Sequence, residues 1–253
     1  MGLLSVESLP PPSVSTRMLD ETVEARCDEL GVSSRVQQAA ESLSGYISFG
    51  LRVPAVVFAL LKRLERFAAR DGRRVAHASS GARAAVKLLA QACAQHAGQL
   101  YDLLPAMVRF GTQSLSDCED SVRDAFAAAL SAAVREHAPR MTAEAARAQL
   151  VAPFVSSLGN QSNSRGGALA LRAVLRALPA HQLQACEDTV AAALKRHLGA
   201  GKPGMTTQPQ LRALLLDCVA AMLTASESPE AVEGLAQIAI GCAQAPDWRE
   251  RLA

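Results

Sequence analysis

An arginine returns at nearly regular intervals along this chain, and this repetition constrains the fold more than any other feature. Each of these arginines follows a short stretch of Ser, Asp, Asn or Thr and precedes an alanine-rich apolar run. Successive arginines are 48, 40, 42 and 47 residues apart, close to the ~40–47 residues of repeats built from helix pairs. The repeated position is occupied by Arg35, Arg83, Arg123, Arg165 and Arg212.

The composition favours helices over a sheet. Hydrophobic residues make up 49% of the 253 residues and charged residues 20%, which is typical of a folded domain. Alanine, the commonest residue, has the highest helix propensity and lets helices approach one another closely. We therefore predict an all-α fold, namely a HEAT/armadillo-type α-solenoid of stacked antiparallel helix pairs. Such scaffolds bind other macromolecules more often than they catalyse reactions.

Apolar residues that recur three and four positions apart predict about eleven helices. Residues 1–15 include three consecutive prolines and are expected to form a flexible lead, whereas 16–253 are expected to form one HEAT/armadillo-like domain. The last residues, from Asp247, begin like a new helix, so we expect a chain truncated at its C-terminus. The predicted helices span 17–29, 33–49, 54–70, 80–97, 100–115, 119–138, 143–158, 164–178, 180–198, 208–224 and 229–244.

Charge and cysteine content narrow the possible environments. The 26 basic and 24 acidic residues give a net charge of +2, so no global field would attract nucleic acid or an anionic membrane. The six cysteines stand mostly beside alanine or valine, which predicts buried free thiols in a reducing compartment. Residues 1–16 do not match a secretory or mitochondrial signal, and no apolar stretch reaches ~18 residues without a charge. We expect a cytoplasmic protein without membrane insertion.

The repeated arginines have two interpretations. In stacked helical repeats, such an arginine commonly pairs with an acidic residue of its own or a neighbouring repeat. The candidate partners are Asp120, Asp188 and Asp217. Exposed pairs contribute only ~0–1 kcal/mol each, so a ladder of them would set geometry more than stability. We favour this structural role over direct contact with a partner protein.

A basic run lies at 62–74, with Glu65 and Asp71 as its only acids. We interpret it mainly as a solvated helix face whose cations lie toward the negative end of the helix dipole. The alternative is a docking patch for an acidic protein. Its candidate partner-binding residues are Lys62, Arg63, Arg66, Arg70, Arg73 and Arg74, opposite a buried side formed by Val57, Leu60, Leu61, Leu64 and Phe67.

No pattern predicts a catalytic, metal or cofactor site. Pro203 follows Lys202 where a phosphate-binding loop needs Ser or Thr. Cys93 and His96 are one helical turn apart, but zinc needs about four ligands and no second pair has a compatible spacing. No histidine lies in a nucleophile motif. The single Arg-Gly-Gly at 165–167 is interpreted as packing glycines at a close helix crossing, not as an RNA-binding tract.

Three segments between about 119 and 224 carry a family pattern: SVRDAFAAALSAAVREHA, QLVAPFVSSLGNQSNSRGGALALRAVLRALPAHQLQ and QPQLRALLLDCVAAML. The second has an arginine-glycine helix start, an alternating Ala/Leu run and an ending at Leu-Pro. The residues concerned are Ser164, Arg165, Gly167, Ala170, Leu171, Leu178, Pro179 and Leu183. These segments resemble the tubulin-folding cofactor D family, also called tubulin-specific chaperone D. Residues 1–78 show no clear match, and members of that family are several times longer.

The resemblance implies a non-enzymatic chaperone segment, without a cofactor, that binds β-tubulin during folding or assembly of the αβ heterodimer. It also implies other tubulin-folding cofactors and an Arl-type small GTPase as partners, and an association with the microtubule cytoskeleton. Since GTP is hydrolysed in tubulin in that system, it assigns no catalytic residue to this chain. A generic HEAT/armadillo adaptor is the alternative, and an enzyme site hidden among the helices is the least favoured hypothesis.

Overall fold

The amphipathic, alanine-rich segments fold into helices throughout the part of the chain that the structure describes. The computed structural model describes residues 14–68, 76–198, 209–224, 226 and 228–243. Within these ranges there is no strand, so the all-α prediction is confirmed there. The proposed flexible lead lies mostly outside the described residues. Its last two residues, however, already belong to the first helix, α1 (Val14–Glu29), which begins earlier than the sequence predicted.

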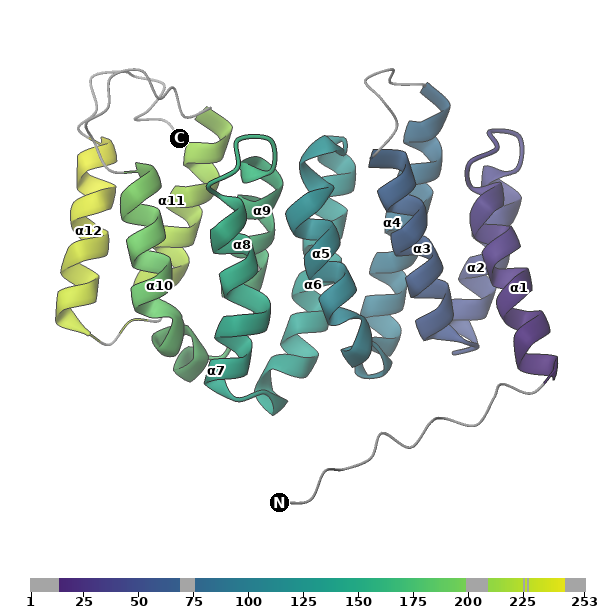
Figure 1. The fold of residues 1–253 in the computed structure, drawn as a ribbon, viewed down its shortest axis with the longest axis horizontal. Helices are drawn as coiled ribbons and strands as arrows, with labels where there is room; N and C mark the ends of the chain where they lie inside the picture. The colour runs from purple at the N-terminus through teal and green to yellow at the C-terminus, as the bar shows by residue number, and fades with distance from the viewer. Residues whose placement is uncertain (1–13, 69–75, 199–208, 225, 227, 244–253) are drawn as a thin grey trace.

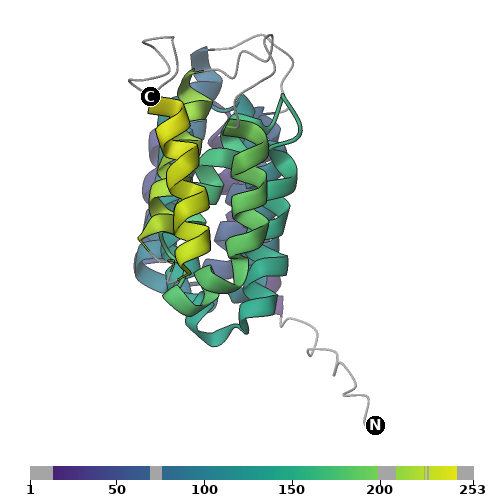
Figure 2. The ribbon, with the colours of Figure 1, turned by 90° about the vertical axis from the view of Figure 1, so that its left-hand side faces the viewer.

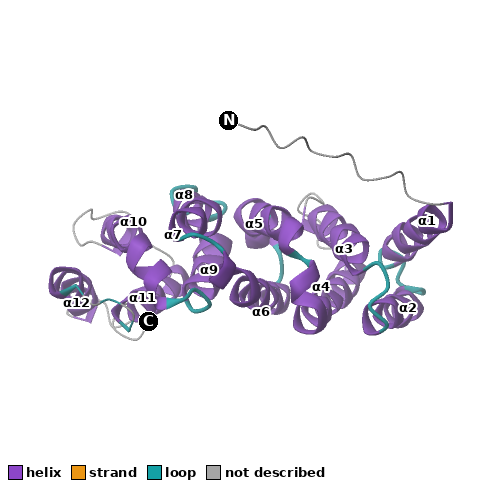
Figure 3. Ribbon diagram, turned by 90° about the horizontal axis from the view of Figure 1, so that it is seen from below, coloured by secondary structure: helices purple, strands orange, loops and turns teal. Residues whose placement is uncertain are grey.

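Most of the helices fall into two rows (Figure 3). One row, called the α1 row below, contains α1, α3 (Val53–Ala68), α5 (Leu104–Gln113), α8 (Ala152–Ser157) and α10 (Ala180–Leu198). The other, the α2 row, contains α2 (Val36–Ser48), α4 (Ala76–His96), α6 (Asp120–His137), α9 (Ser164–Leu175) and α11 (Pro209–Leu223).

Each helix packs against the next helix of its own row, and α12 (Pro229–Ala243) packs against both α10 and α11 at one end of the array. Figure 2, which looks along the array from that end, shows the helices overlapping in two columns. In Figure 1 the described connections after α1, α5 and α8 lie at the upper edge, and those after α2, α4, α6, α9 and α11 lie at the lower edge, so the helices that they join run antiparallel.

Two predicted helices are irregular. The segment predicted at 100–115 begins with a 3₁₀ turn at Tyr101–Leu103 before α5, and a second 3₁₀ turn, Leu115–Asp117, follows it. The segment predicted at 143–158 consists of α7 (Ala143–Ala146), a π-helical turn at Arg147–Val151, and α8. Pro153 lies in the first turn of α8, where it cannot donate a backbone hydrogen bond to the preceding turn. The π-helical turn just before α8 is consistent with the absence of this hydrogen bond.

The core lies between the two rows and is mainly aliphatic. Three phenylalanines fill its middle: Phe110 of α5, Phe126 of α6 and Phe154 of α8 are completely buried. The ring centroids of Phe110 and Phe126 are 4.8 Å apart. Each ring comes from a different helix, so this cluster joins the two rows at the centre of the array.

Polar side chains tie neighbouring units together at the ends of α4 and α6. His96, at the end of α4, donates from Nε2 to the carbonyl oxygen of Ile47 at the end of α2, at 2.7 Å. His137, at the end of α6, donates in the same way to Ala97 just after α4, also at 2.7 Å. The two histidines are 41 residues apart. Each carbonyl oxygen also accepts a backbone N–H, from Gly50 and Leu100 respectively, so the histidines add a second hydrogen bond at these helix ends.

Gln182 of α10 extends this series of ties. Its side-chain Nε2 donates to the carbonyl oxygens of Ala138, at 2.6 Å, and Met141, at 2.9 Å, in the connection after α6. The sequence analysis did not assign a role to these three side chains. Their chemistry could have suggested it, because each is a buried or half-buried donor near a predicted helix end.

Candidate functional site

All five repeated arginines belong to the α2 row. Arg123, Arg165 and Arg212 lie in the first turns of α6, α9 and α11, and Arg35 is the residue that caps the N-terminus of α2. Arg83 lies in α4. The arginine repeat in the sequence therefore corresponds to one row of helices in the structure.

The prediction that Arg83 lies near a helix start is wrong. Helix α4 begins at Ala76, about two helical turns before Arg83. The sequence suggested a helix start there because Gly81 and the preceding serines resemble a turn. In the structure Gly81 is a buried helical residue, and an added Cβ would collide with the carbonyl oxygen of Leu30 and the ring of Phe67. The glycine therefore permits close packing of α4 and does not end a helix.

Asp120 joins two of the repeated arginines where α6 meets α9. It forms ion pairs with Arg123, on its own helix, and with Arg165 of α9, at 3.1 Å. Arg123 is only 7% exposed, and its guanidinium also donates to the carbonyl oxygens of Ser116, at 3.0 Å, and Cys118, at 2.5 Å. At this position the arginines have the predicted structural role, and Asp120 is their predicted partner.

Two glycines bring α9 close to its neighbours at the same place. A Cβ on Gly166 would lie 2.6 Å from the backbone nitrogen of Ser116, and one on Gly167 would collide with the hydroxyl of Ser157. The N–H of Gly166 donates to Ser116 Oγ at 2.8 Å. The interpretation of these residues as packing glycines is confirmed.

The acidic partners farther along the row differ from those predicted. Asp217 of α11 pairs with Arg172 of α9, at 2.7 Å, and more distantly with Arg176, at 3.9 Å. Among the described residues Asp188 forms no ion pair. Asp120 therefore pairs with repeated arginines, as predicted. Asp217 pairs instead with Arg172 and Arg176, which are not among the repeated arginines. Arg172 lies two helical turns after Arg165 and therefore on the same side of α9. This spacing could have indicated that Arg172 also faces the neighbouring helix.

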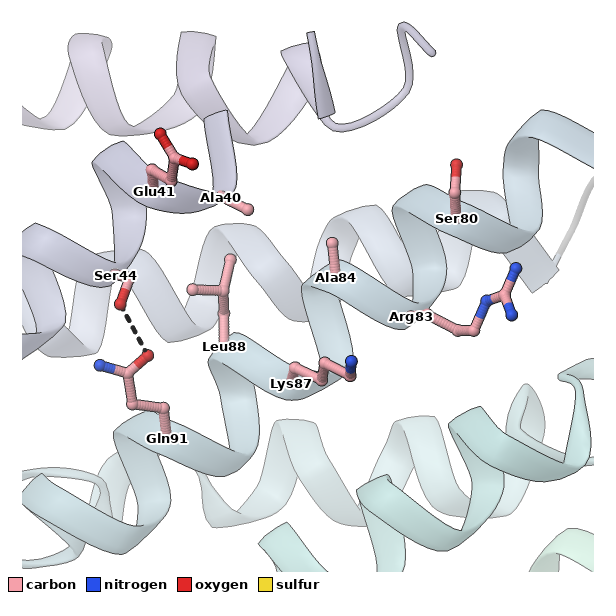
Figure 4. A pocket seen from close by; sticks show the side chains of 9 residues that line it. All are labelled: Ala40, Glu41, Ser44, Ser80, Arg83, Ala84, Lys87, Leu88 and Gln91. Carbon is pink, nitrogen blue, oxygen red and sulfur yellow. Dashed lines mark hydrogen bonds between the residues drawn. The ribbon is translucent and has the colours of Figure 1, made fainter. Parts of the chain in front are cut away.

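An open groove of about 650 Å³ lies between α2 and α4 (Figure 4). Ser44 of α2 donates to Gln91 Oε1 at 3.0 Å, and Gln91 Nε2 donates to Ser48 at 3.1 Å. Arg83 and Lys87 are exposed and lie one helical turn apart on α4. The sequence analysis did not find this groove, whose lining residues are Ala40, Glu41, Ser44, Ser80, Arg83, Ala84, Lys87, Leu88 and Gln91.

The described part of the basic run makes intramolecular contacts. Arg63 and Arg66 of α3 both pair with Asp28 of α1, at 3.2 and 2.9 Å. Lys62 is exposed, with its ammonium 4.5 Å from the centroid of the Phe58 ring. These contacts support a structural role for Arg63 and Arg66. The remaining candidates, Arg70, Arg73 and Arg74, lie outside the described residues.

The predicted buried side of this helix agrees with the structure. Phe67 is partly buried, and its ring stacks under the guanidinium of Arg63, whose carbon lies 4.9 Å from the ring centroid. The other four predicted residues, Val57, Leu60, Leu61 and Leu64, are almost completely buried.

The cysteines behave as small core residues. Five side chains are described, all as free thiols. Burial raises the pKa of Cys27, Cys93, Cys118 and Cys218 to about 12, and that of Cys186 to about 11. These thiols stay protonated at neutral pH, whereas nucleophilic catalysis uses the thiolate.

In the described ranges no group of three His, Cys, Asp or Glu side chains is arranged to hold a metal ion. No helix there is both long and apolar enough to cross a membrane.

No protein-family model matches the chain, and no curated protein matches it at a significant level. The α2–α4 groove and the two rows of helices are therefore the main guides to function, together with the sequence pattern at 119–224.

Proposed function

We propose that this chain is a HEAT/armadillo-type α-solenoid that serves as a protein-binding scaffold. One observation carries the proposal: each helix packs on the next of its own row, and the five regularly spaced arginines all fall on the α2 row. In a stack of this kind each unit contacts only its neighbours, so the long sides stay available to other macromolecules. The chain contributes no catalytic step in this proposal.

For the partner we propose tubulin, with β-tubulin as the subunit bound. The support is the resemblance of residues 119–224 to the tubulin-folding cofactor D family. This segment forms α6 to α11, and its arginine-glycine helix start is the close crossing at Gly166. The same resemblance would add other tubulin-folding cofactors and an Arl-type small GTPase as partners, and would place the protein in the cytoplasm near microtubules.

Capture of purified tubulin by the immobilised full chain tests the partner. We expect saturable binding without GTP hydrolysis by the chain itself. On α6, Arg135 is exposed and lies within the segment of resemblance, so Arg135→Glu is expected to weaken capture. Lys195→Glu, an exposed change of equal charge on α10, tests whether the effect depends on the α2 row. No capture by a chain with normal helicity would rule out tubulin.

A generic adaptor is the second candidate, and one observation favours it. The groove between α2 and α4 lies wholly outside residues 119–224, so the segment with the tubulin-cofactor pattern does not form it. A binding site there would serve a scaffold whether or not its partner is tubulin. If tubulin binds to residues outside the groove, the chain can be both a tubulin-binding scaffold and an adaptor that binds a second protein in the groove.

A further inference from the structure

We propose that residues 248–252 of this chain bind back along the outer face of α12 and cover that end of the array. Helix α12 packs against α10 and α11 on its inner side. Figure 2, which looks at the array from this end, shows α12 in front of the other helices. The proposal adds to the scaffold function and holds whether or not tubulin is the partner.

The outer face of α12 changes from acidic to apolar along the helix. Its exposed residues recur three or four positions apart, so they lie on one side. Glu230 and Glu233 lie near the start of the helix, whereas Ile240, which is 54% exposed, lies near its end. The exposed residues described after Pro229 are Glu230, Glu233, Gly234, Gln237, Ile240 and Gly241.

The described part of the chain leaves this face uncovered. Within it, neither Glu230 nor Glu233 forms an ion pair. An added Cβ on Gly234 or Gly241 would meet nothing within 4 Å, so there is space on both sides of Ile240 along the helix. The face therefore has room for a segment that brings an apolar side chain to Ile240 and a cation to the two carboxylates.

The residues that follow α12 have the complementary pattern, in the order that an antiparallel segment needs. Residues 244–253 lie outside the described ranges and are joined to the apolar end of the face, where α12 ends. In this segment Trp248 comes first, and Arg249 and Arg251 follow it. Pro246 lacks the N–H that a continuing helix would use, so the chain can reverse its direction before Trp248.

The spacing of the two patterns agrees as well. Ile240 and Glu233 are seven residues apart on α12, a rise of about 10 Å. Trp248 and Arg251 are three residues apart, and three residues of extended chain also span about 10 Å. With the Trp248 ring on Ile240, the guanidinium of Arg251 reaches Glu233. That carboxylate accepts one hydrogen bond from Gln237, at 3.3 Å, and has acceptor positions left for the arginine.

The chain's own segment is favoured over the same segment of a second copy. A segment joined to its site by a short linker meets that site at an effective concentration of the order of mM. Four residues, 244–247, separate the end of α12 from Trp248. A second copy would have to reach a comparable concentration in solution to compete.

Intrinsic fluorescence of the full chain tests the proposal, because Trp248 is the only tryptophan. Compared with a peptide of residues 244–253, we expect emission at shorter wavelength and acrylamide quenching at least about threefold weaker, because the ring is shielded from water. Ile240→Gln should remove most of this protection. Val32→Gln, at an exposed valine beyond α1, is the matched control. Emission and quenching equal to those of the peptide would overturn the proposal.

A charge exchange tests the direction of the segment. Glu233→Lys and Arg251→Glu should each increase the quenching of Trp248, and the double variant should restore the protection, which a general loss of stability would not do. Glu24→Lys, at an exposed position of α1, is the charge-matched control. Single variants that quench like the wild type would contradict the antiparallel placement. Protection that rises with protein concentration would assign the segment to a second copy and overturn the proposal.

Discussion

The α2–α4 and α6–α9 contacts are equivalent places in the array, yet they are built in opposite ways. At α6–α9, Asp120 binds both Arg123 and Arg165, and Gly166 of α9 packs closely against Ser116 in the 3₁₀ turn just before α6. At α2–α4 the helices leave an open groove, and Arg83 and Lys87 are exposed at its side. Asp120 gives Arg123 and Arg165 a structural role at α6–α9, whereas Arg83 is exposed beside an open groove at α2–α4.

The largest effect is expected from glycine substitutions at the two contacts. Gly166→Ala should lower the free energy of unfolding by ~2 kcal/mol, because the added Cβ would lie 2.6 Å from a backbone nitrogen. Gly45→Ala on α2, where nothing lies within 4 Å, should raise it by ~0.5–1 kcal/mol. Urea denaturation of both variants measures the difference. Changes of the same sign would show that the two contacts are packed alike.

Removing a carboxylate from the closed contact should have a smaller effect. Asp120→Ala leaves the buried Arg123 guanidinium without its counter-ion, but Asp120 is itself largely exposed, so we expect a loss of ~1 kcal/mol. Asp124→Ala, at an exposed position of the same helix, is the matched control. Lys87→Ala at the groove should change the unfolding free energy by less than ~0.5 kcal/mol. A loss at Lys87 as large as that at Asp120 would contradict the comparison.

The buried thiols of α4 and α11 should make the protein less stable in alkali. Burial raises the folded pKa of Cys93 in α4 and of Cys218 in α11 from the ordinary thiol value of 9.0 to about 12. Above pH 9 the unfolded chain releases these protons while the folded chain keeps them, so stability falls as pH rises. Urea midpoints at pH 8 and pH 10 measure this, and Cys93→Ala with Cys218→Ala should reduce the drop. If the urea midpoint of the double variant falls as much as that of the wild type, the loss of stability does not come from these two thiols.

The smallest effect is expected at Arg35, the repeated arginine of the first unit. A hydrogen bond from Arg26 lowers the pKa of Glu29, and Arg35 adds to this from 3.2 Å. A lowered folded pKa stabilises the protein at neutral pH, and that contribution is lost as pH falls through it. Because the carboxylate is solvent-exposed, Arg35→Ala should raise the Glu29 pKa only slightly in an NMR titration. A large shift would make Arg35 a structural residue like Arg123.

Local chemistry made part of this structure predictable. The helix positions follow from apolar periodicity, and the role of Gly166 follows from glycines placed inside an apolar helix start. Gly81 misled the prediction because a glycine that permits packing and a glycine that ends a helix look alike in one dimension. The Arg172–Asp217 pair joins residues 45 positions apart, which no local pattern reveals.

The sequence by itself determined the all-helical class and the repeat that recurs every 40 to 48 residues, because periodicity and propensity act within one helix. Only the tertiary structure decided which arginines pair, which glycines lie at crossings, and where a groove remains. Those features depend on atoms from different helices approaching within a few ångströms. The groove between α2 and α4 is likewise lined by side chains of two helices that are separate in the sequence.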